Sequence, residues 1–158
     1  VWLPDGNTCA HCGQEHRAAN AGMSCASTAA MQVGGAWVAP AFAEEAARRA
    51  IEALKQEGFG IITEINVKET FKKKINVDFR NYRILGACNP TLAHEALQLE
   101  DKVGTMLPCN VVVQDIGGGR TEVAAIDPVA SMQAIANPRL KQAAERVGAK
   151  LKKVIDGL

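Results

Sequence analysis

Residues 82–99 read YRILGACNPTLAHEALQL, and they contain two different periodicities joined by a short turn. Tyr82 to Cys88 is typical of a buried strand, and Thr91 to Leu99 is typical of a helix. Asn89 is a good N-cap residue, and Pro90 is a good first helical residue. Cys88 is therefore expected immediately before a helix N-terminus, where unpaired backbone N–H groups favour a thiolate.

A second cysteine motif, LPCN at residues 107–110, opens a Val-rich stretch from Cys109 to Asp115 that is expected to be a strand. If this strand neighbours that of Cys88, two thiols meet, and His94 lies about one helical turn into the intervening helix. Two sulfurs and an imidazole suit Zn or Cu(I), whereas two thiols alone suit redox exchange. The structural alternative is that both cysteines are small buried hydrophobic residues and that His94 is an ordinary helical residue.

The composition favours one domain and argues against several functional classes. Of 158 residues, 47% are hydrophobic but only 4% are aromatic, so the core is expected to consist mostly of Ala, Val, Ile and Leu. The net charge of +1 argues against a nucleic-acid-binding protein, and the run Lys72 to Lys74 is most simply a solvated helix end. No stretch reaches the roughly 18 apolar residues that a membrane-spanning helix needs.

Strand and helix patterns alternate along the chain from Met31 onward. We expect strands at 31–38, 59–66, 82–88, 109–115 and 120–126, with a Gly-rich hairpin at 117–119. We expect helices between Pro40 and Gly58, at 67–75, at 91–99, after Asp127 and after Asn137. This pattern predicts an α/β (α+β) domain with an antiparallel-rich sheet packed by helices.

The last helix has an apolar seam whose spacing alternates between four and three residues. Its members are Leu140, Ala144, Val147, Leu151, Val154 and Leu158. The simpler interpretation is a helix that lies on the sheet, and the alternative is that part of the seam faces a partner subunit.

Residues 1–30 form an N-terminal arm whose composition differs from the rest of the chain. The arm contains three of the five cysteines and two of the three histidines but few large apolar residues, so it cannot order itself by burial. Cys9 and Cys12 supply two metal ligands from one Cys-x-x-Cys turn, and His16 and Cys25 would complete a tetrahedral set. Disulfide pairing and unpaired thiols remain alternatives, although an odd number of cysteines fits a fully paired monomer poorly.

The chain begins at Val1 rather than Met, which slightly favours N-terminal processing and export over a cytoplasmic location. An arm of this kind is also a common means of joining subunits, because it can dock on a neighbouring surface.

Five short motifs in a fixed order resemble the bacterial and archaeal domain of unknown function numbered 302, over about residues 31–158. The motifs are EGFGI at 57–61, RILGACNP at 83–90, AHEAL at 93–97, LPCNV at 107–111 and IDP at 126–128. The resemblance implies a two-layer β-α-β(4)-α-like layout, which has been compared with the TATA-binding-protein-like fold, and a homodimer. It does not imply DNA binding, because a shared fold does not carry function. Residues 1–30 lie outside it.

Three hypotheses of function follow. The preferred one is a small homodimeric binding module with a site at Cys88, Cys109 and His94 for a metal or a thiol-reactive ligand. The alternative is a structural subunit whose N-terminal arm links dimers into a larger, extracellular homopolymer. A thiol-based enzyme is the least supported hypothesis, since no matched general base, acidic pair or cofactor fingerprint is present.

Overall fold

The five strands of the domain form one sheet in which every neighbouring pair is antiparallel. The computed structural model describes residues 33–39, 43–133, 135 and 137–158. The strand order is β1-β5-β4-β3-β2. The strands are β1 (Val33–Ala39), β2 (Gly60–Asn66), β3 (Tyr82–Cys88), β4 (Cys109–Gly117) and β5 (Arg120–Ile126). The predicted α/β class and antiparallel sheet are therefore confirmed.

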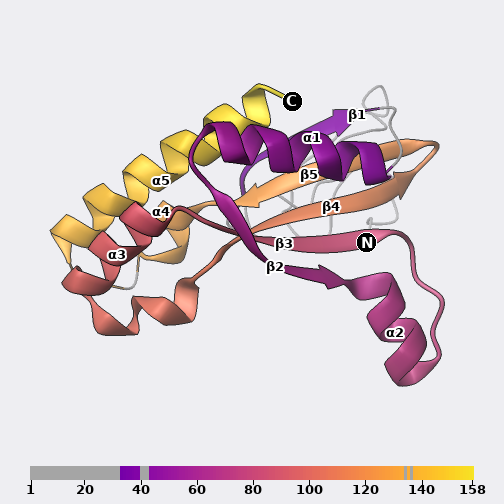
Figure 1. Cartoon of the computed structure of the whole chain (residues 1–158), viewed down its shortest axis with the longest axis horizontal. Helices are drawn as coiled ribbons and strands as arrows, with labels where there is room; N and C mark the ends of the chain where they lie inside the picture. The colour runs from indigo at the N-terminus through magenta and orange to yellow at the C-terminus, as the bar shows by residue number, and fades with distance from the viewer. Residues whose placement is uncertain (1–32, 40–42, 134, 136) are drawn as a thin grey trace, which may run out of the picture. The chain divides into compact units, whose positions relative to one another are not determined.

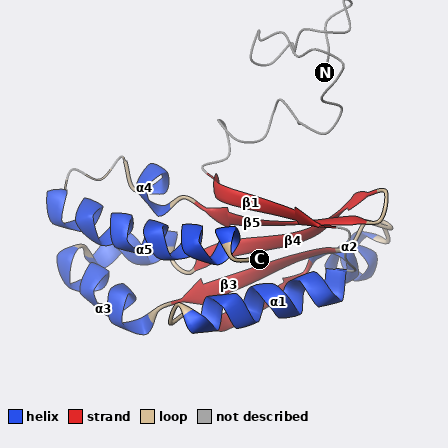
Figure 2. Cartoon of the chain, turned by 90° about the horizontal axis from the view of Figure 1, so that it is seen from above, coloured by secondary structure: helices blue, strands red, loops and turns tan. Residues whose placement is uncertain are grey.

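Two long helices, α1 (Ala43–Gln56) and α5 (Pro138–Asp156), cover the same face of this sheet (Figure 1; Figure 2). The shorter helices are α2 (Val67–Ile75), α3 (Pro90–Leu99), the 3₁₀ helix η2 (Asp101–Met106) and α4 (Pro128–Ser131). The main core lies between the two long helices and the sheet, and its larger members are Leu54, Phe59, Leu85, Val111, Val113, Val123, Leu151, Val154 and Ile155. None of the described helices is long and apolar enough to cross a membrane.

Helix α1 packs closely on the sheet because its buried face is made mostly of small side chains. Ala46, Ala47 and Ala50 are buried there, and Leu54 adds the one large side chain that is fully buried. Glu44 and Glu45 lie in the first turn, where their negative charges interact favourably with the positive end of the helix dipole. The helix therefore has the amphipathic form that the sequence predicts, although the structure describes it only from Ala43 onward.

The apolar seam of α5 is used within the chain. Five of the six predicted members lie on α5, and Leu158 follows its C-cap Gly157. All six are buried or half-buried, and they pack into the chain's own core or line its cavity. This confirms the interpretation of α5 as a helix that lies on the sheet, so the seam is not left free for a partner.

Several boundaries and one element differ from the predictions. Strand β2 begins at residue 60 rather than 59, β4 ends at 117 rather than 115, and α3 begins at 90 rather than 91. The first strand is described from Val33 to Ala39 rather than from 31 to 38, because residues 31 and 32 lie outside the described part. The 3₁₀ helix η2 was not predicted, since its six residues are too few to show a helical period. The arm and its candidate ligands Cys9, Cys12, His16 and Cys25 also lie outside the described residues, so arm-mediated assembly stays a prediction.

Gly86 allows the two cysteine motifs to approach each other closely. A Cβ atom at this position would collide with Thr63 Oγ1 and would lie 2.7 Å from Pro108 Cγ. Pro108, which follows a cis peptide bond, thus packs directly against the strand that carries Cys88. Only glycine leaves room for both neighbours.

We therefore expect Gly86→Ala to lower the free energy of unfolding by about 1–3 kcal/mol, the usual cost of overpacking. Gly60→Ala is the matched control, because a Cβ there comes no closer than 4.0 Å to its nearest neighbour, the Cys88 carbonyl oxygen. Chemical denaturation of both variants measures the difference. Equal transition midpoints for the two variants would contradict the close approach.

Candidate functional site

The pairing of β3 with β4 brings Cys88 and Cys109 to the same end of the sheet. Ala87 lies opposite Cys109 in the antiparallel register, so Cys88 occupies the adjacent position. Both cysteines line one cavity, and neither forms a disulfide. The neighbouring strands that the sequence hypothesis required are therefore present.

Capping fixes the position of Cys88 at the junction of β3 and α3. The Asn89 Oδ1 atom accepts a hydrogen bond from the Leu92 backbone N–H at 3.2 Å, and Pro90 is the first residue of the helix. The predicted N-cap is confirmed. Because the strand ends at Cys88 and the cap follows at once, the backbone of Cys88 is held at the strand–helix junction, beside the cavity that its side chain lines.

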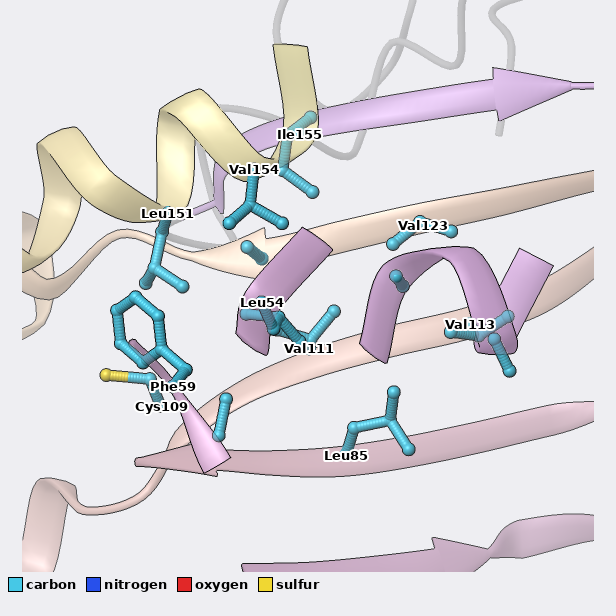
Figure 3. Close-up of a cluster of buried hydrophobic side chains, with 14 of the residues drawn as sticks. Leu54, Phe59, Leu85, Cys109, Val111, Val113, Val123, Leu151, Val154 and Ile155 are labelled. Carbon is cyan, nitrogen blue, oxygen red and sulfur yellow. The ribbon is translucent and has the colours of Figure 1, made fainter. Parts of the chain in front are cut away.

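The cavity is small, and its walls are mostly apolar. Its volume is about 30 Å³, enough for one ion or one water-sized molecule but well below the hundreds of Å³ that an organic ligand needs. The apolar lining includes Phe59, Leu92, Leu107, Leu140, Ala144 and Val147. Figure 3 shows Cys109 beside the ring of Phe59 at the margin of the hydrophobic core.

Burial of Cys109 disfavours its thiolate. Desolvation, with a smaller effect from the charge of Cys88, raises the pKa of Cys109 to about 11, compared with an ordinary value of 9.0. Cys109 is therefore a neutral thiol at neutral pH. Any ligand that binds the sulfur as a thiolate must displace a proton.

His94 does not join the two cysteines. Its side chain is exposed and is not part of the cavity lining, whereas Leu92, Ala93 and Ala96 are. Across the described part of the chain, no three side chains of His, Cys, Asp or Glu type are grouped so that they could hold a metal ion. The spacing of Leu92, Ala93 and Ala96 was a usable signal, because it defines the inner face of the helix and leaves His94 outside.

Sequence reasoning missed Met132, which follows α4 and lines the same cavity. Its thioether is a third soft sulfur among the residues that line the cavity. No motif singles out this residue, and only the packing of α4 against α5 places it at the cavity.

The raised pKa of Cys109 predicts a loss of stability at alkaline pH. The folded state holds the thiol proton more tightly than the unfolded state, so this stabilisation is complete below about pH 9 and disappears as pH rises through about 11. A shift of this size corresponds to at most about 3 kcal/mol. We expect Cys109→Ala to lose less stability than the parent between pH 8.5 and 11 when both are unfolded by denaturant under reducing conditions. Parallel losses in the two proteins would show that Cys109 does not titrate in this way.

Comparisons with known proteins agree with the fold and the motifs. The model of the family described as domain of unknown function DUF302 matches residues 38–158. The crystal structure of a conserved DUF302 protein from Bacillus stearothermophilus is similar to this chain, with a TM-score of 0.69 and 31% sequence identity over 77% of this chain and 95% of that one. No curated protein matches. Because the family model covers most of the chain and the structural relative shares its fold, this chain belongs to the DUF302 family.

Proposed function

We propose that the domain is a small binding module that holds one Cu(I) ion between Cys88 and Cys109. The observation that carries the proposal is that two unpaired thiols line one small apolar cavity. Thiolate and thioether sulfurs select soft metals such as Cu(I), which is stable with only two thiolate ligands. Zinc normally takes three or four protein ligands, and His94 is not placed to supply one. Of the two metals expected from the sequence, Cu(I) fits better.

The size and the polarity of the cavity support an ion rather than an organic ligand. About 30 Å³ admits a metal ion without rearrangement. Apart from the sulfur-containing side chains, Asn89 is the one polar residue in the lining, and its Oδ1 is already engaged in the helix cap. A soft ion with few ligands suits such an environment, because it does not require a shell of oxygen donors.

The direct test is an anaerobic titration of Cu(I) against a chromophoric Cu(I) chelator. The arm cysteines must be removed as competitors, so the parent for this test carries Cys9→Ser, Cys12→Ser and Cys25→Ser. We expect Cys88→Ser or Cys109→Ser to weaken binding by at least about 100-fold, which is about 2.8 kcal/mol. Met132→Leu should have a smaller effect, and His94→Asn, the matched control, should have none.

The pH dependence gives an independent check. Since Cys109 has a pKa of about 11 and must lose its proton to bind, the affinity should rise about tenfold per pH unit for each proton displaced. Unchanged affinity in both cysteine variants would end the proposal. The homodimer that the family resemblance implies stays a prediction, and native mass spectrometry of the same samples counts chains and copper ions together.

A further inference from the structure

Helix α2 carries an apolar stripe that the chain buries only in part. Val67, Phe71 and Ile75 recur at intervals of four residues, which places them on one side of the helix. None of the residues of α2 is buried, and Ile75 is 63% exposed. Figure 1 shows α2 projecting from the end of β2, away from α1 and α5. The stripe is therefore half-buried at Val67 and Phe71 and exposed at Ile75.

An apolar groove lies between α2 and the β2–β3 pair. It has a volume of about 480 Å³ and is lined by Ile65, Val67, Phe71, Phe79, Tyr82 and Ile84, together with Thr70. Phe71 and Phe79 meet edge to face at 5.2 Å, which makes its wall well packed. The groove shares no residue with the cysteine cavity and is large enough for several side chains of a partner.

The segment that forms this groove is strongly basic. Residues 67–82 contain five Lys and Arg against two Asp and Glu, a net charge of +3 in a chain whose total is +1. Arg83, the next residue, is ion-paired with Glu44 and Glu64 and does not add to this excess. Ion pairs with Lys73 and Lys72 already engage Glu69 and Asp78, the two carboxylates of the segment. Lys68 donates to the neutral Asn81 side chain. The excess positive charge is therefore not neutralised within the segment.

Arg80 carries part of this charge and lies against the rings of Phe79 and Tyr82, two residues that line the groove. Its guanidinium carbon lies 4.6 Å from the centre of the Phe79 ring and 5.4 Å from that of Tyr82. The Nη2 atom donates to Gln114 Oε1 at 2.8 Å, which fixes the plane of the group. Its remaining N–H groups can receive a carboxylate beside an apolar surface, the arrangement in which arginine binds acids well.

We propose that this groove docks an acidic peptide segment of a partner protein, whose apolar side chains enter the groove while its carboxylates meet Arg80 and the α2 lysines. Charge decides against a symmetric contact between two copies, because each would present the same positive segment to the other. A lipid bilayer is flat, whereas much of the apolar surface here is recessed between a helix and a sheet. Single-stranded nucleic acid needs open aromatic faces for stacking, and Arg80 covers the rings of Phe79 and Tyr82.

The experiment uses the full-length protein and a fluorescent peptide in which two leucines are flanked by glutamates. Fluorescence anisotropy should show binding that weakens with added salt and falls at least about fivefold when the glutamates are replaced by glutamine. Ile65→Glu places a carboxylate in the groove at a side chain that is already 47% exposed, so it should weaken binding about tenfold without unfolding the domain. Lys72→Gln should weaken binding less. Ile116→Glu and Lys141→Gln change equivalent exposed residues elsewhere and should have no effect.

Results of three kinds would overturn the proposal. The first is the absence of binding, or binding that Ile65→Glu leaves unchanged while circular dichroism shows a folded protein. The second is tighter binding to phosphatidylglycerol vesicles or to a single-stranded oligonucleotide than to the peptide. The third is a change of oligomeric state in Ile65→Glu on native mass spectrometry, which would assign the groove to a second copy of the chain.

Discussion

The antiparallel pairing of β3 with β4 is the constraint on which the rest of the structure depends. Its register sets Ala87 opposite Cys109, so both cysteine motifs reach the same end of the sheet. A slip of one residue would turn Val111 and Val113 away from the helices and would remove Cys109 from the core. The fit of Pro108 and Thr63 against Gly86 opposes such a slip. The hydrophobic core and the cysteine cavity therefore depend on the same register.

The sheet separates two regions of different chemistry. Where α3, α4 and α5 meet the ends of β3 and β4, alanine, leucine and other apolar side chains leave a cavity that is small and apolar. Beyond the end of β2, α2 leaves a wide groove with cations around it. The first region suits a soft ion that must lose its water. The second suits a partner that brings both apolar and acidic groups.

Most of the fold could be predicted from the sequence because short local sequence signals mark where its helices and strands begin and end. Asn89, Asp127 and Asn137 each precede proline, and each accepts a backbone hydrogen bond as an N-cap. Hydrophobic periodicity then identifies the elements between these caps. The 3₁₀ helix between α3 and β4 was missed because its six residues show neither the helical nor the strand period of apolar residues.

The candidate site was predictable only in part. The sequence places Cys88 and Cys109 at strand ends, and they come together if the two strands are neighbours. The structure shows that β3 and β4 are neighbours. The side from which His94 projects depends on the rotation of α3 relative to the sheet, and Met132 reaches the cavity only through the packing of α4 on α5. Both depend on contacts between distant segments. The α2 groove also depends on contacts between different elements, since it is formed by α2 together with the paired strands β2 and β3.

X-ray absorption spectroscopy at the copper edge tests the central claim most directly. The sample is the Cu(I)-loaded full-length protein in which the three arm cysteines are replaced by serine. If Cys88 and Cys109 bind the ion in their shared cavity, the first coordination shell contains only sulfur, with two thiolates and at most the Met132 thioether. Nitrogen or oxygen in that shell, or a protein that retains no copper, would contradict the account.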